Sequence, residues 1–127
     1  MPVSQEYLDY VLDQLTFFGQ VQSRRMFGGA GLYLNALFFG LVADDVLYFK
    51  VDDTNKAEYL AAGSGPFRPF GAESYIMGYY EVPAEILEDR DLLKEWAAKA
   101  FQVALGKKVE RAKKPASGNK KPRRKKS

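Results

Sequence analysis

The chain has 127 residues, which suffices for one domain built around a single hydrophobic core. It contains no cysteine and no histidine, so disulfides, thiolate metal sites, cysteine nucleophiles and serine–histidine catalytic sites are excluded. Residues 1–105 carry 8 basic and 15 acidic side chains, a net charge of −7, whereas residues 106–127 carry 11 basic and 1 acidic, a net charge of +10. We therefore expect two electrostatic units, an acidic body and a basic tail.

The first ten residues do not resemble a secretory leader, because they include Glu6 and Asp9 and no basic side chain. The longest apolar run, residues 36–43, is too short to cross a bilayer. These observations predict a cytoplasmic protein with no membrane contact, in which association with the nucleoid is an open option.

Apolar residues at three- and four-residue spacing predict an amphipathic first helix between Ser4, a suitable N-cap, and Gly19. Gln14 is expected on its polar face. The predicted buried stripe consists of Tyr7, Leu8, Val11, Leu12, Leu15 and Phe18.

From Gln22 the apolar pattern has a period of two and predicts an antiparallel meander with strands at 22–27, 31–34, 37–43 and 46–51. A glycine-rich stretch turns or bulges the chain between the first two strands, and Asn35-Ala36 and Asp44-Asp45 form the later turns. One face should carry Tyr33, Phe38, Val42, Leu47, Phe49 and Val51, and the other Leu32, Leu34, Phe39, Leu41, Val46, Tyr48 and Lys50. Because both faces are apolar, helices, loops or a second subunit should cover both.

The second half of the chain predicts two further helices and one strand. Asp53 is expected to cap a short helix that ends at Ala62, and residues 63–71 should form a loop packed onto the body. Residues 74–82 form a fifth strand, and Asp89 caps a final helix that ends at Gly106. The predicted buried stripe of this helix consists of Leu92, Leu93, Trp96, Ala97, Ala100, Phe101 and Ala104.

The predicted fold class is therefore α+β, with an antiparallel sheet of about five strands flanked by an N-terminal, a short middle and a C-terminal helix. Residues 1–105 should form the domain. Residues 106–127 lack aromatic side chains and cannot bury enough surface to offset the entropy of ordering, so they are predicted to be a disordered tail.

Four segments of the chain, taken in order, resemble the N-terminal domain of the TfoX/Sxy family of competence regulators. They are RRMFGGAGLY (24–33), DDVLYFKVD (44–52), AAGSGPF (61–67) and MGYYEVP (77–83), and the resemblance spans roughly residues 4–105. It implies an α+β fold and a role in activating competence genes together with the cyclic-AMP receptor protein. Full-length regulators carry a second, helical C-terminal domain, where this chain has a basic tail. The resemblance implies no catalytic residues.

Basic residues in and near the strands form a candidate anion or ligand site, together with one tyrosine: Arg24, Arg25, Lys50, Arg68 and Tyr79. Neighbouring strand residues point to opposite faces, so the two arginines meet only if the glycine bulge twists the strand. In the alternative reading, one arginine pairs with an acid such as Glu81 and the other is solvated.

A cluster of aromatic residues could form a platform for bases or a flat ligand, or could simply pack the core; its members are Phe67, Phe70, Tyr75, Tyr79 and Tyr80. Adjacent carboxylates at 44–45 and 52–53 are better explained by turns and caps than by a metal, so neither a metal nor a cofactor is expected.

The basic tail predicts non-specific binding to nucleic-acid phosphates, because it offers many cations and no rigid element to read bases. Its cations are Lys107, Lys108, Arg111, Lys113, Lys114, Lys120, Lys121, Arg123, Arg124, Lys125 and Lys126. Two alternatives are a tail that folds back onto the acidic body and a tail that only maintains solubility.

Taken together, the sequence predicts a non-enzymatic regulatory or adaptor domain of the TfoX/Sxy type, a candidate transcriptional co-regulator that its tail tethers to nucleic acid. Apolar sheet surface would suit a homodimer or a protein partner. The alternative is a small-ligand-binding or catalytic domain with a pocket under the 63–71 loop.

Overall fold

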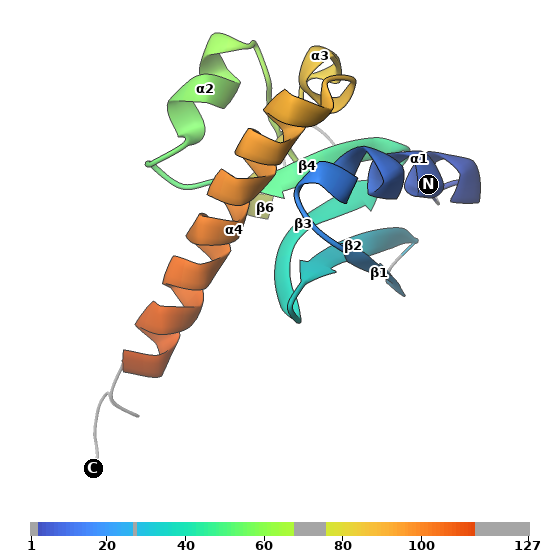
Figure 1. Ribbon diagram of the computed structural model, residues 1–127. Helices are drawn as coiled ribbons and strands as arrows, with labels where there is room; N and C mark the ends of the chain where they lie inside the picture. The colour runs from blue at the N-terminus through green and yellow to red at the C-terminus, as the bar shows by residue number, and fades with distance from the viewer. Residues whose placement is uncertain (1–2, 27, 68–75, 114–127) are drawn as a thin grey trace.

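An antiparallel sheet with helices packed on one side dominates the computed structural model, which describes residues 3–26, 28–67 and 76–113 (Figure 1). The fold is α+β, as predicted. In chain order the elements are α1 (Gln5–Gln14), a 3-10 turn η1 (Leu15–Phe17), β1 (Gln22–Met26), β2 (Gly29–Leu34), β3 (Leu37–Ala43), β4 (Val46–Lys50), α2 (Lys56–Ala61), β5 (Pro66–Phe67), β6 (Ile76–Glu81), α3 (Ala84–Leu87) and α4 (Arg90–Lys113).

The sheet has six strands in the order β1-β2-β3-β4-β6-β5, and every neighbouring pair is antiparallel. The additional strand, β5, lies within the expected 63–71 loop. Pro66 is tolerated there because β5 is an edge strand, where a missing N–H breaks no ladder. Glu81 donates its backbone N–H to the carbonyl of Gly65 at 3.0 Å, which begins the pairing. Residues 68–71 of the expected loop lie outside the described residues.

Both predicted two-residue turns are confirmed. Asn35 and Ala36 have φ of 53° and 66°, and Asp44 and Asp45 have φ of 54° and 56°. Positive φ at both central residues defines a type I′ turn, whose twist matches that of the flanking strands. The turn between β1 and β2 instead uses Gly28, whose φ of 80° only glycine adopts without strain.

Phe39 is the extra residue of a β-bulge between β2 and β3, and this bulge corrects the predicted assignment of faces. Leu32 pairs with Gly40, whereas the next residue, Tyr33, pairs with Phe38. The bulge therefore turns Phe39 into the core and moves Phe38 to the opposite face. Strict alternation predicts Phe38 and Val42 on the same face. The extra residue at position 39 shifts this alternation, so Phe38 and Val42 lie on opposite faces.

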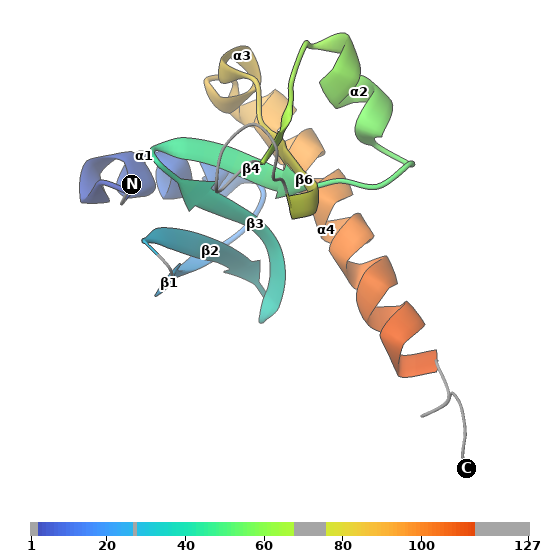
Figure 2. The same ribbon diagram turned by 180° about the vertical axis from the view of Figure 1, so that it is seen from behind.

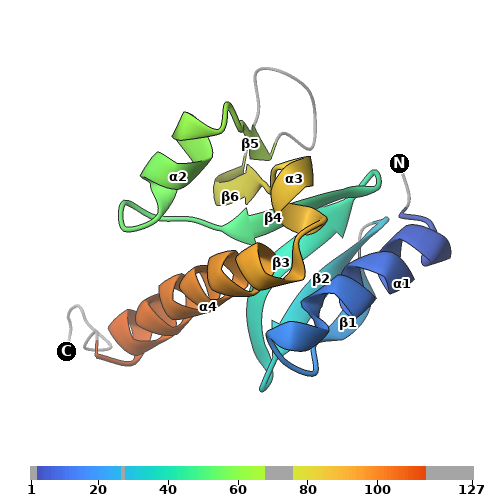
Figure 3. The same ribbon diagram turned by 45° about the horizontal axis from the view of Figure 1, so that its top comes forward.

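α1 and α4 lie on the same face of the sheet (Figures 1 and 3). The sheet residues buried beneath these helices, on what we call the helix face, are Ala30, Leu32, Phe39, Val42, Leu47 and Phe49. Figure 2 shows the opposite side, where neither α1 nor α4 crosses the strands. We call this side the back face; its residues include Arg24, Gly31, Tyr33, Phe38, Leu41, Tyr48 and Lys50. α1 and α4 thus cover one of the two apolar faces that were expected to be covered by helices, loops or a second subunit (Figures 1 and 2).

The helix N-caps follow the prediction at two positions and differ at one. The Ser4 hydroxyl accepts from the backbone N–H of Tyr7 at 3.2 Å, and Asp89 accepts from the N–H groups of Asp91 and Leu92 at 3.0 and 3.1 Å. Asp53 does not cap α2, which begins three residues later, at Lys56. A turn made by Asp52 and Asn55 precedes this helix instead.

α4 continues through Gly106 to Lys113, so the predicted end of the helix is wrong. A glycine inside a helix costs only about 1 kcal/mol relative to alanine, and the next proline in the sequence, Pro115, comes nine positions later. The first eight residues of the expected disordered tail, 106–113, are therefore helical, and residues 114–127 lie outside the described residues. The buried stripe of α4 includes Val103, whereas Leu92 is exposed.

None of the helices in the described part of the chain is long and apolar enough to span a bilayer.

Candidate functional site

The two adjacent arginines of β1 lie on opposite faces of the sheet. Arg24 is exposed on the back face, and its guanidinium carbon lies 5.8 Å from the centre of the Tyr33 ring. Arg25 points to the α1 side, where it donates to the carbonyl of Val3 at 2.8 Å and to the side chain of Gln5 at 2.9 Å. The glycines after β1 do not bring the two together, so the predicted anion site does not contain both.

A continuous row of side chains crosses the back face, and we call it the cation–aromatic row. It runs from Arg24 to Tyr33 (5.8 Å), then to Phe38 (5.2 Å between ring centres), to Tyr79 (5.8 Å) and to Lys50, whose Nζ lies 4.7 Å from the Tyr79 ring centre. Lys50 Nζ also donates to the Tyr79 hydroxyl at 3.4 Å. The row joins β1, β2, β3, β4 and β6, with Arg24 at its β1 end and the pair of Lys50 and Tyr79 at the other.

Gly31 lies beneath the row and makes it possible. A Cβ atom at this position would lie 2.7 Å from Met26 Cε, 2.8 Å from Phe38 Cε1 and 3.1 Å from Tyr33 Cε1. These distances are too short for a carbon contact, so any larger residue would displace the rings. The bulge at Phe39 is the second requirement, because it places Phe38, together with its partner Tyr33, on the same face as Leu41 and Lys50.

Three of the five predicted ligand-site residues, Arg24, Lys50 and Tyr79, therefore belong to one structure on the back face. Arg25 is on the other side, and Arg68 lies outside the described residues. Tyr33 and Phe38 were missed by the sequence prediction of this site. The two-residue turn after Leu34 was a usable signal, because such a turn places residues 33 and 38 directly opposite each other.

The predicted aromatic platform is divided. Phe67 stacks against Tyr48 with ring centres 4.6 Å apart, and Tyr79 belongs to the row. Tyr80 instead lies 6.0 Å from Tyr59 of α2 and packs against the core. The remaining members, Phe70 and Tyr75, lie outside the described residues.

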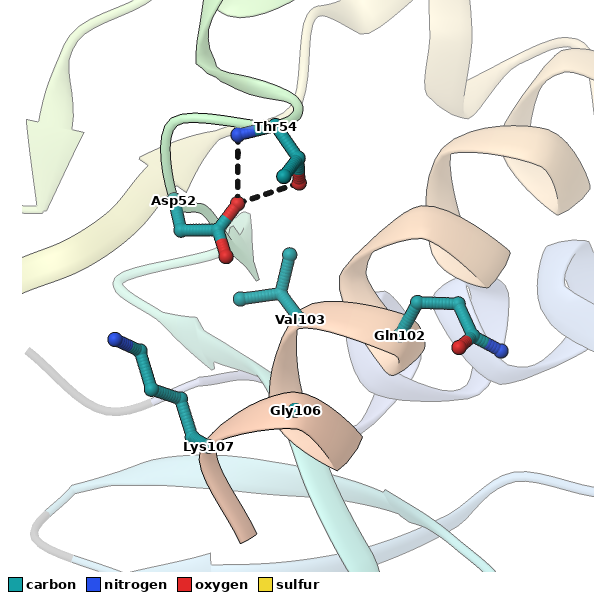
Figure 4. A pocket seen from close by; sticks show the side chains of 6 residues that line it. All are labelled: Asp52, Thr54, Gln102, Val103, Gly106 and Lys107. Carbon is teal, nitrogen blue, oxygen red and sulfur yellow. Dashed lines mark hydrogen bonds between the residues drawn. The ribbon is translucent and has the colours of Figure 1, made fainter. Parts of the chain in front are cut away.

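An open pocket of about 430 Å³ lies between the turn that precedes α2 and the second half of α4 (Figure 4). Its lining residues are Asp52, Thr54, Gln102, Val103, Gly106 and Lys107. The Asp52 carboxylate accepts from the Thr54 hydroxyl at 2.5 Å and from the Thr54 N–H at 2.8 Å. The hydroxyl bond is the main reason why the pKa of Asp52 is lowered, and the Lys107 charge adds to the shift. None of its lining residues belongs to the 63–71 loop, where the sequence predicted a pocket.

Among the described residues, no group of three or more carboxylates is placed to hold a metal ion. Of the predicted tail cations, Lys107 lines the pocket, and Lys108, Arg111 and Lys113 occupy positions in the last turns of α4. Lys114, Lys120, Lys121, Arg123, Arg124, Lys125 and Lys126 lie outside the described residues.

The fold defines a small α+β domain, with an antiparallel sheet that carries helices on one face (Figure 1). The family model of the TfoX N-terminal domain matches residues 13–104, and the chain belongs to this family. A comparison with curated proteins finds no match. The family supports a regulatory, competence-type domain in general terms.

Proposed function

We propose that this protein is a non-enzymatic regulatory or adaptor domain of the TfoX type that its basic C-terminal segment tethers to nucleic acid in the cytoplasm. A finer proposal is that it acts as a transcriptional co-regulator, with the tail supplying affinity and the folded body supplying specificity.

The course of α4 is the observation that carries the tether. The helix extends beyond the sheet at its C-terminal end (Figure 1), so the start of the basic segment points away from the acidic body. Residues 106–127 carry a net charge of +10, and residues 1–105 carry −7. A polycation of this kind can contact phosphates although the body as a whole is acidic.

Neutralisation of phosphates releases condensed counterions, so binding through the tail should depend steeply on salt. Each lost phosphate contact reduces the slope of log affinity against log salt by about 0.9 on duplex DNA. The slope therefore measures the number of phosphate contacts. It distinguishes direct contacts made by the tail from a general effect of the protein's net charge.

The experiment compares two doubly substituted full-length proteins of equal net charge. One carries Lys120→Gln and Lys121→Gln in the tail, and the other carries Lys56→Gln and Lys94→Gln in the body. Fluorescence anisotropy with a labelled duplex, measured over a range of salt concentrations, should show weaker binding and a slope smaller by up to about 2 for the tail variant alone. Equal effects of the two pairs would show that no tail tether exists.

A further inference from the structure

We propose that the cation–aromatic row is a binding surface for single-stranded nucleic acid, with bases stacked on Tyr33 and Phe38 and a phosphate held by Arg24. The inference shares only the class of ligand with the proposed tether, since it concerns the back face of the sheet and a different kind of contact. It assigns the folded body a direct role in binding.

The order of groups along the row matches the repeating chemistry of a single strand. Such strands are bound by aromatic rings that stack with bases and by cations that contact the backbone. Arg24 is exposed, and Tyr33 and Phe38 are each half-buried, so part of each side chain remains accessible. Their ring centres lie 5.2 Å apart, so we expect each ring to stack with a different base of the strand.

The length of the row favours an extended strand over a small flat ligand. From β1 to β4 it crosses three strand spacings of about 4.8 Å, a total of roughly 14 Å. A single aromatic ligand would cover one or two rings and leave the Arg24 guanidinium unused. A short run of nucleotides reaches from the exposed guanidinium of Arg24 across both rings.

The local charge also favours an anion at this end of the face. The body as a whole is acidic, with 8 basic and 15 acidic side chains in residues 1–105, yet Arg24 and Lys50 both contribute to this row. Glu81 pairs with Tyr48, on the far side of β4 from Arg24. A strand bound near β1 and β2 therefore meets Arg24 first.

A second copy of the chain is a less favourable occupant. β1 is an edge strand, and antiparallel pairing of two β1 strands would bring Arg24 and Arg25 close to the same residues of the other copy. Like charges opposite each other destabilise such a pair, and charged side chains are a common protection of sheet edges.

The test measures binding of the full-length protein to three probes of equal length: a single-stranded DNA, the same strand with abasic sites throughout, and the duplex. Tyr33→Leu and Phe38→Leu remove a stacking ring from the row. Arg24→Gln and Arg25→Gln remove the same charge from neighbouring positions on opposite faces, which makes Arg25→Gln the matched control for Arg24→Gln. Tyr10→Leu, an exposed tyrosine of α1, controls for loss of an aromatic ring. Circular dichroism and thermal unfolding verify that each variant is folded.

We expect the wild-type protein to bind the normal single strand more tightly than the abasic strand. Tyr33→Leu, Phe38→Leu and Arg24→Gln should each weaken binding of the normal strand roughly fivefold or more, the lower end of the contribution of one stacked base. Binding to the duplex should change little, and the two control variants should behave like the wild type.

Equal affinity for the normal and abasic strands, or equal losses in Arg24→Gln and Arg25→Gln, would overturn the inference. If the tail variant loses duplex binding and Tyr33→Leu and Phe38→Leu have no effect, the tether is supported and the row is rejected as a binding surface. Base-dependent binding that survives neutralisation of the tail would support the row. A concentration-dependent dimer that Tyr33→Leu abolishes, without base-dependent binding, would identify a second copy as the occupant instead.

Discussion

The backbone N–H of Ser4 donates to Oδ1 of Asp45 at 2.8 Å and thereby ties the start of α1 to the turn between β3 and β4, 41 residues later. The same serine caps α1 through its hydroxyl, so one residue connects the first helix to the sheet. This bond fixes where α1 begins relative to the strands that it covers.

Asp45→Ala should therefore destabilise the protein more than Asp44→Ala, by about 1 kcal/mol, the typical net value of a hydrogen bond. Both positions have φ near 55°, so alanine introduces the same backbone strain at each, and only Asp45 holds Ser4. Chemical denaturation of the two variants measures the difference in the free energy of unfolding. Identical values would mean that the Ser4 bond contributes nothing.

Gly31→Ala should destabilise the protein by about 1–3 kcal/mol, the usual cost of overpacking. The new methyl group would press on the rings of Tyr33 and Phe38, which cannot move without disturbing the cation–aromatic row. Gly65→Ala is the matched control, because a Cβ there meets no atom of the described residues within 4 Å. Thermal unfolding should show a lower Tm for Gly31→Ala only, and an unchanged Tm would show that the row adapts freely.

Tyr59→Phe should leave stability unchanged or increase it by up to about 1 kcal/mol. The Tyr59 hydroxyl is buried between α2 and the rest of the core, and it has no hydrogen-bond partner among the described residues. Its ring lies 4.6 Å from that of Trp96, and phenylalanine preserves this contact. A loss of more than about 1 kcal/mol in urea denaturation would show that the hydroxyl has a partner in the folded protein.

The protein should lose stability as pH rises from 10 to 12. Burial, with a contribution from the Asp45 charge, raises the pKa of Tyr7 from 10.0 to about 12. In this range the unfolded state has released the tyrosine proton and the folded state still holds it, so the unfolded state binds fewer protons and stability falls. Tyr7→Phe should reduce the slope of the free energy of unfolding against pH, whereas Tyr10→Phe on the exposed part of α1 should not.

Burial also raises the pKa of Tyr48 and Tyr59, so some alkaline loss should remain in Tyr7→Phe. A slope that is the same in the wild type and in Tyr7→Phe would contradict the burial of the Tyr7 hydroxyl.

Thr54→Val should raise the pKa of the Asp52 carboxyl, and Lys107→Gln should raise it by a smaller amount. The hydrogen bond from Thr54 is the largest cause of the lowered pKa, and the Lys107 charge is a lesser one. An NMR titration of the Asp52 side chain measures both shifts. Lys107 and Asp52 line the same pocket, so an unchanged value in Lys107→Gln would contradict the placement of Lys107 beside Asp52.

Local sequence patterns predicted the parts of this protein that depend on neighbouring residues. The strand at 37–43, the type I′ turns on either side of it and the caps at Ser4 and Asp89 all occur as expected. Each depends on the backbone preferences or hydrogen bonds of residues within a few positions, which the sequence displays directly.

The tertiary structure decided the features that depend on distant pairing. Gln14, expected on the polar face of α1, is buried, because its amide donates to the carbonyl of Leu87 and accepts from Arg90, more than 70 positions away. β5 exists only because β6 offers an edge, and the bulge at Phe39 depends on how β2 and β3 align. The cation–aromatic row follows from that alignment. Alternation along one strand cannot reveal it, since a single extra residue reverses which face every later side chain occupies.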